Sequence, residues 1–163
     1  MKTIAGLVVV AAVATAGDYF WYTYGVRHNM SNGIVYGVVL LTTVGLVLGA
    51  LSGRVLRGLP IGALAGMGGA LGYYLLIAVM DPRPYGLAIP GAWLMMWLLL
   101  AALEGRWLNV PPRPLAGIAA RGLGAAVLGS VAFYLVMETL WGRPPETGRN
   151  YFVQFLAWVF AWA

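Results

Sequence analysis

Acidic side chains inside apolar segments are the residues of this chain best placed to do chemistry. Asp18 and Glu138 each lie several residues inside a hydrophobic stretch, where an ionisable group is costly and usually faces a partner or a water-filled cavity. Two such acids at similar depth could hold a lipid headgroup or line a polar pathway. They could equally be neutralised by loop arginines, and for Asp18 the simplest alternative is a local ion pair with Arg27.

The candidate ligand-binding residues share one predicted depth, near one face of the membrane. They are Asp18, Tyr22, Glu138 and Gln154. Because two carboxylates repel an anion, we expect these residues to favour a neutral, hydroxyl-bearing headgroup over a phosphate. A further acid, Glu104, falls at the opposite face, where its nearest obvious partner in the sequence is Arg106.

Catalytic and metal-binding alternatives find little support in the residue types present. His28 and Ser31 with Asp18 upstream permit only a sketch of a nucleophile, base and acid, and triads are recognised by geometry. The chain has no cysteine and one histidine, which excludes thiolate ligands and bis-histidine haem within one chain. The glycines of Gly66-Met67-Gly68-Gly69 lie in an apolar segment without the lysine of a phosphate-binding loop. We therefore expect a non-enzymatic protein without metal or cofactor.

Composition indicates the environment in which these residues are positioned. Of the 163 residues, 61% are hydrophobic and 9% are charged, whereas soluble domains carry about 25% charged residues. The ten Lys and Arg residues stand singly in loops, as residues that orient membrane helices do. They do not form a basic patch, so we expect no nucleic-acid partner. The sequence predicts an all-α, multi-pass membrane helix bundle.

Six hydrophobic segments divide the chain, which we expect to form a single membrane domain over residues 1–163. The predicted segments cover residues 3–24, 33–51, 59–80, 88–103, 115–140 and 151–163. About 20 apolar residues cross a bilayer, and the sixth segment reaches only ~20 Å at 1.5 Å per residue, which leaves open whether it spans. Lys2 and the apolar run ending in Ala14-Thr15-Ala16 also fit the outline of a signal peptide.

Glycine spacing in the second and third segments predicts how the helices pack. Glycines recur four residues apart in both segments, and small-residue faces let helix backbones approach closely in lipid. The predicted packing residues are Gly62, Gly66 and Gly69. We expect the third segment to be the central helix of the bundle.

The distribution of basic residues predicts the orientation. Alternate loops fall on opposite sides, and the side of the amino terminus carries six basic residues against four on the other. The six are Lys2, Arg54, Arg57, Arg106, Arg113 and Arg121. Because positive residues favour the cytoplasmic side, we expect the amino terminus, and with six segments also the carboxyl terminus, in the cytoplasm.

Several short patterns in the carboxyl-terminal half form one set. They are Trp97 with Glu104-Gly105-Arg106, Arg121-Gly122-Leu123-Gly124 leading through Phe133-Tyr134-Leu135-Val136 to Trp141, and Asn150-Tyr151-Phe152-Val153. Over residues 93–162 this set resembles the Insig (insulin-induced gene protein) family of regulatory membrane proteins. The resemblance implies a six-helix bundle with both termini cytoplasmic and a lipid- or sterol-sized cavity.

The same resemblance implies a partner-binding role for Glu104. Eukaryotic members of the family use an aspartate after the fourth span to engage a partner membrane protein, and that position falls on Glu104. Here the residue is a glutamate, which leaves lipid binding as the more transferable expectation.

Two functional classes remain open from the sequence. The first is a lipid-binding protein, for a neutral or sterol-like lipid in a cavity of the bundle, with a regulatory role. Its partners would be a membrane lipid and another membrane protein or a second copy of the chain. The alternative is a small transporter or channel component that uses Asp18 and Glu138 in a polar pathway.

Overall fold

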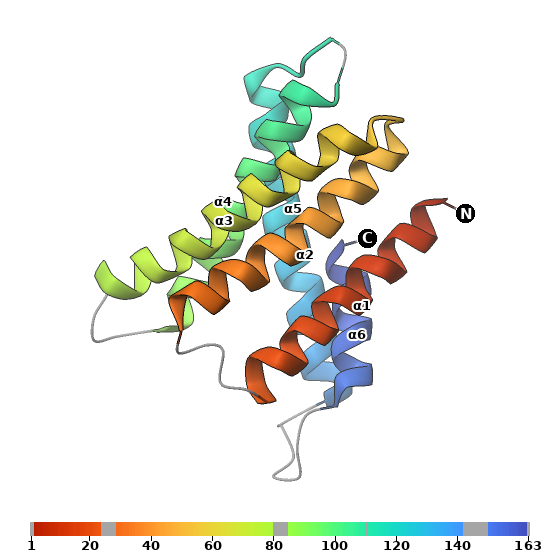
Figure 1. The fold of residues 1–163 in the computed structure, drawn as a ribbon. Helices are drawn as coiled ribbons and strands as arrows, with labels where there is room; N and C mark the ends of the chain where they lie inside the picture. Colours follow the sequence, from red (N-terminus) through yellow and green to blue (C-terminus); the bar gives the residue numbers. More distant parts are fainter. Residues whose placement is uncertain (1, 24–28, 80–84, 110, 142–149, 163) are drawn as a thin grey trace.

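Six α-helices make up most of the chain in a computed structural model (Figure 1). The structure describes residues 2–23, 29–79, 85–109, 111–141 and 150–162. The helices are α1 (Lys2–Thr23), α2 (Met30–Leu51), α3 (Val55–Val79), α4 (Tyr85–Trp107), α5 (Leu115–Val136) and α6 (Tyr151–Trp162), and α5 continues into a π-helical turn, η2 (Met137–Trp141). No strand occurs in the described ranges. Four stretches, Thr3–Phe20, Met30–Leu51, Val55–Val79 and Leu115–Leu140, are long and apolar enough to cross a membrane. The predicted all-α membrane bundle is confirmed.

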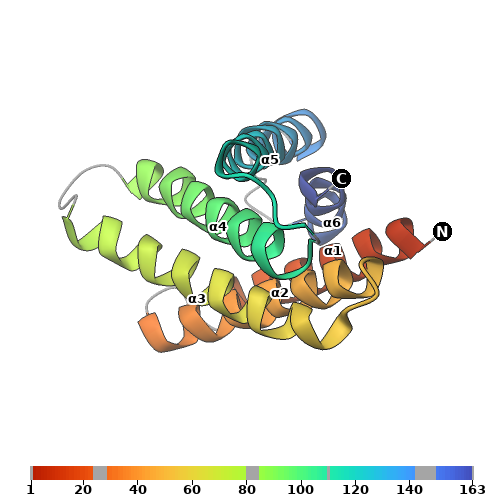
Figure 2. The ribbon, with the colours of Figure 1, turned by 90° about the horizontal axis from the view of Figure 1, so that it is seen from above.

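Three layers of helices make up the bundle. Viewed from above, α1, α2 and α3 form one layer, with α2 in the middle (Figure 2). Helices α4 and α6 cover this layer, α4 against α3 and α6 against α1, and α5 packs against both of them from behind. Helices α2, α3 and α4 extend beyond the predicted apolar segments, because a helix that leaves the hydrocarbon can continue among polar headgroups. In α4 this extension carries Glu104 and Arg106.

The contact between α2 and α3 is made by glycines. A Cβ atom on Gly62 would collide with the carbonyl oxygen of Leu41, and one on Gly66 with the carbonyl oxygen of Gly37. Gly69 faces α4 instead, where a Cβ would lie 2.9 Å from the Cβ of Met96. The three predicted glycines thus stand at close helix contacts.

The prediction that the third segment, α3, is the central helix of the bundle is wrong, however. Helix α3 packs against α2 and α4, so that it lies along one edge of the first layer (Figure 2). A tight turn joins it to α2, with Gly53 at φ 71°, a left-handed conformation that glycine adopts without steric cost. The glycine-rich face therefore fixes one helix pair rather than organising the whole bundle.

Aromatic rings hold the short helix α6 in place. The Trp158 ring stacks on Trp93 of α4 at 5.5 Å and contacts Phe133 of α5 at 4.8 Å between ring centroids. Trp162 contacts Trp97 of α4 at 4.7 Å. Such pairs add about 0.5–1.5 kcal/mol each to the burial of their surface. These contacts dock α6, whose 12 residues cover only about 18 Å.

Candidate functional site

Asp18 is the centre of a buried hydrogen-bonded cluster that joins three helices. Its Oδ2 atom accepts hydrogen bonds from Gln154 Nε2 at 2.5 Å and Trp158 Nε1 at 2.6 Å, both on α6. Its Oδ1 atom accepts one from the Tyr36 hydroxyl of α2 at 3.0 Å. Asp18 and Gln154 are buried, and a buried polar group is costly unless it is hydrogen-bonded. The cluster therefore stabilises Asp18 in the bundle and fixes α6 against α1 and α2.

Of the four residues predicted to bind a ligand, the structure brings together Asp18 and Gln154. Tyr22 lies at the exposed end of α1, and Glu138 is exposed in η2. Arg27, the predicted ion-pair partner of Asp18, lies outside the described residues. That these four residues bind a ligand stays a prediction.

Sequence reasoning missed two members of the Asp18 cluster, Tyr36 and Trp158. A signal was available for Trp158, because it follows Gln154 by four residues and therefore shares its helix face. No comparable signal pointed to Tyr36, whose position depends on how α2 turns toward α1.

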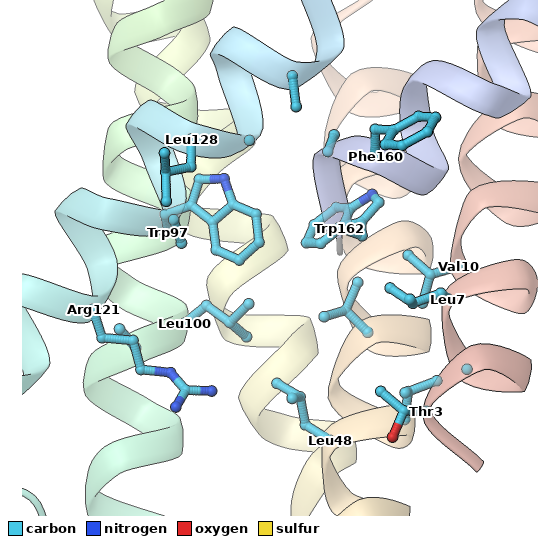
Figure 3. A pocket seen from close by; sticks show the side chains of 18 of the residues that line it. Thr3, Leu7, Val10, Leu48, Trp97, Leu100, Arg121, Leu128, Phe160 and Trp162 are labelled. Carbon is cyan, nitrogen blue, oxygen red and sulfur yellow. The ribbon is translucent and has the colours of Figure 1, made fainter. Parts of the chain in front are cut away.

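A cavity of about 640 Å³ lies elsewhere, between α5 and the layer of α1 and α2, flanked by α4 and α6 (Figure 3). Its lining on α1 covers the first turns, Thr3 to Val10, and on α4 it ends at Glu104, whereas Asp18 lies near the other end of α1 and does not line it. Most of its lining is aliphatic or aromatic. The lining includes Leu7, Val10, Val44, Leu48, Trp97, Leu100, Ala125, Phe160 and Trp162.

One side of this cavity is open. Leu128 and Leu135 of α5 line it and are 71% and 57% exposed, and Phe160 of α6 is 56% exposed. Leu128 lies in the middle of the apolar stretch Leu115–Leu140, so the opening beside it faces hydrocarbon when the bundle is in a membrane. A lipid could enter sideways without crossing a polar barrier.

The polar end of the cavity is built on an ion pair. Arg121 Nε lies 3.4 Å from Glu104 Oε2, and Asn109 Nδ2 donates to Glu104 Oε1 at 3.2 Å. Glu104 is buried, whereas the Arg121 side chain is 48% exposed. The expected pairing with Arg106 is not the one that forms, because residues two apart on a helix do not face each other. The partner-binding role of Glu104 stays a prediction.

Two indole N–H groups of the cavity lining lack an acceptor. Trp97 Nε1 and Trp162 Nε1 are buried and make no hydrogen bond within the part of the chain that the structure describes. A buried donor left unsatisfied costs about 1–3 kcal/mol.

Metal chemistry has no candidate centre in the described ranges, where no three His, Cys, Asp or Glu side chains come close enough to hold an ion. The chain matches no protein-family model, no curated protein and no solved structure in the three comparisons made. The cavity and its ion pair are therefore interpreted from their own chemistry.

Proposed function

We propose that this protein is a non-enzymatic membrane protein that binds a lipid in the cavity between α5 and the α1–α2 layer. The observation that carries the proposal is the shape of that cavity, which is apolar along its length and polar at one end. Ligand sites commonly have volumes of about 300–1,000 Å³ with few polar groups in an apolar lining. The 640 Å³ found here falls in that range.

The length of the cavity suits a lipid tail. Its lining on α5 runs from Arg121 to Leu135, and these 14 steps of 1.5 Å cover about 21 Å. One leaflet contributes about 15 Å to a hydrocarbon core of about 30 Å. A tail that starts beside Arg121 would therefore lie along α5 for the depth of its leaflet, and α1, α2 and α4 would enclose its first ~10 Å, because their linings cover seven residues of rise each.

The proposed orientation places the headgroup at the cytoplasmic face. Thr3 of α1 and Arg121 of α5 lie at the end of the bundle that the charge bias assigns to the cytoplasm. The ligand would then come from the inner leaflet. A lipid is also the ligand class that the resemblance to the Insig family implies, and a regulatory role through another membrane protein or a second copy belongs to the same proposal.

The alternative of a transporter or channel component gains less support. A residue in a transport pathway must release its partners, whereas both carboxylate oxygens of Asp18 accept hydrogen bonds from neighbouring helices. Glu138, the second acid of that pathway, is exposed in η2.

Filling the cavity tests the proposal. Ala125 lines it from α5, so Ala125→Phe should occupy the space of the tail and remove most of the bound lipid, about fivefold or more, because such cores tolerate little added volume. Ala120→Phe is the matched control, since Ala120 is exposed on the same helix and does not line the cavity. Bound lipid is measured by mass spectrometry after mild detergent extraction. Equal lipid retention in the two folded variants would refute the proposal.

A further inference from the structure

We propose that the ligand of this cavity is an anionic amphiphile whose carboxylate or phosphate headgroup binds the guanidinium of Arg121. This inference rests on the proposed lipid-binding function and names its ligand class. It departs from the expectation of a neutral headgroup near Asp18, because the cavity lies at the other end of the bundle and is headed by a cation.

The ion pair of Arg121 with Glu104 leaves the two terminal nitrogens of the guanidinium available to a ligand. The ion pair with Glu104 uses the Nε atom, and no hydrogen bond of the two terminal nitrogens is present among the described residues. Figure 3 shows the side chain entering the cavity from α5. A guanidinium presents five N–H donors in a planar fork that matches a carboxylate or phosphate. The two terminal nitrogens can therefore hold an anionic headgroup while Nε keeps its contact with Glu104.

Glu104 holds the guanidinium of Arg121 in position and does not prevent it from binding an anion. The carboxylate is buried and receives a hydrogen bond from Asn109, so its charge is shared between two donors. Arg121 is the seventh residue of α5, about 9 Å from the helix start, where a free side chain would extend toward the headgroups. The ion pair instead holds it at the mouth of the cavity.

The charges at this end of the bundle favour an anion. Its described residues include five arginines and one acid, Glu104. The arginines are Arg54, Arg57, Arg106, Arg113 and Arg121. Arg54 is turned inward, with its Nη1 donating to the carbonyl oxygen of Leu108 at 3.0 Å. The surplus of positive charge attracts an anionic headgroup more strongly than a neutral one.

The remaining lining suits the tail of the same ligand. Farther into the cavity from Arg121 lie Trp97, Leu100 and Trp162 (Figure 3), and the opening along α5 lets a second chain remain in the bilayer. An amphiphile bound in this way satisfies the terminal nitrogens of Arg121 and buries its hydrocarbon among apolar side chains.

Binding of three probes that share an 18-carbon chain tests the inference on the full-length, delipidated protein in detergent. The probes are oleate, oleoyl lysophosphatidate and monooleoylglycerol, which carry a carboxylate, a phosphate and a neutral headgroup. We expect at least one anionic probe to bind about tenfold more tightly than monooleoylglycerol, because charge-assisted hydrogen bonds are the strong ones. Tighter binding of oleate identifies a carboxylate as the preferred headgroup, and tighter binding of lysophosphatidate identifies a phosphate.

Two arginine variants separate a specific contact from general charge. Arg121→Gln should reduce the anion preference, the ratio of the dissociation constants of monooleoylglycerol and the anionic probe, to about twofold or less. Arg106→Gln, which removes an exposed charge at the same end but outside the cavity lining, should keep the preference. An unchanged preference in Arg121→Gln, or an equal loss in both variants, would overturn the inference.

A third variant keeps the test informative if Arg121→Gln folds poorly. Glu104→Gln can keep the hydrogen bond from Asn109 but turns its amide NH2 toward Arg121 and removes the carboxylate that holds the guanidinium at the mouth of the cavity, so the preference for anionic probes should fall several-fold. An unchanged or larger anion preference would contradict the inference. If the neutral and anionic probes bind wild-type protein equally, the headgroup assignment is wrong but lipid binding stands. If none of the three binds, the proposed function itself fails.

Discussion

The close contact between α2 and α3 predicts a measurable stability cost at Gly62. In Gly62→Ala the new Cβ would lie 2.6 Å from the carbonyl carbon of Leu41 and from the Cα of Thr42. Carbon atoms prefer separations of about 3.5 Å or more, so the helices must part by about 1 Å, and a gap of that size forfeits a quarter to a half of each dispersion contact. The obstructing atoms belong to the backbone of α2, which no side-chain rotation can move.

The expected magnitude follows from two opposing terms. Overpacking of a tight interface costs about 1–3 kcal/mol, whereas alanine in place of glycine gains up to about 1 kcal/mol in a helix. Because the obstructing atoms are backbone, the cost lies toward the upper end of its range, and we expect Gly62→Ala to lower the free energy of unfolding by about 2 kcal/mol. Gly124→Ala is the matched control, because no described atom of another helix lies within 4 Å of the new Cβ, and it should raise the free energy of unfolding by about 1 kcal/mol.

Unfolding in mixed micelles, titrated with sodium dodecyl sulfate and followed by far-UV circular dichroism, measures the two free energies under identical conditions. Gly68→Ala adds an intermediate case, since its Cβ meets only the flexible end of Leu99, and should leave stability nearly unchanged. If Gly62→Ala unfolds at the same detergent fraction as the wild type, α2 and α3 do not pack backbone to backbone.

Two further predictions concern the buried carboxylate and the orientation. Asp18→Leu leaves the side-chain donors of Gln154 and Trp158 without their acceptor, which should lower the free energy of unfolding by about 2–4 kcal/mol. Asp18→Asn keeps an acceptor oxygen and should lower it less. Equal stability of the two variants in the same titration would show that these hydrogen bonds contribute nothing. The chain has no cysteine, and Met30 at the start of α2 and Val55 at the start of α3 are each about half exposed at opposite ends of this helix pair. Val55→Cys should therefore react with an impermeant maleimide from the cytoplasmic side and Met30→Cys from outside. The reverse pattern would invert the proposed orientation.

Much of the architecture could be read from the sequence, because lipid restricts what a segment can do. A backbone without water must satisfy its hydrogen bonds internally, so an apolar segment of sufficient length becomes a helix. The positions of Asp18 and Gln154 near one depth also follow from the rise per residue and the alternation of the helices. In the same way, the glycines four residues apart on the second and third segments indicate a close contact, since only small side chains permit one.

Which helices become neighbours was decided by tertiary structure alone. Lipid and apolar side chains are nearly equivalent surroundings, so the apolar residues of a membrane helix do not reveal which face is turned inward. For this reason the sequence suggested Arg106 as the partner of Glu104, whereas the packing of α4 against α5 brings Arg121 to it. The cavity is a consequence of the same packing, since α5 rests on α4 and α6 and leaves space before α2. No local pattern in the sequence encodes that space, because its walls come from five helices.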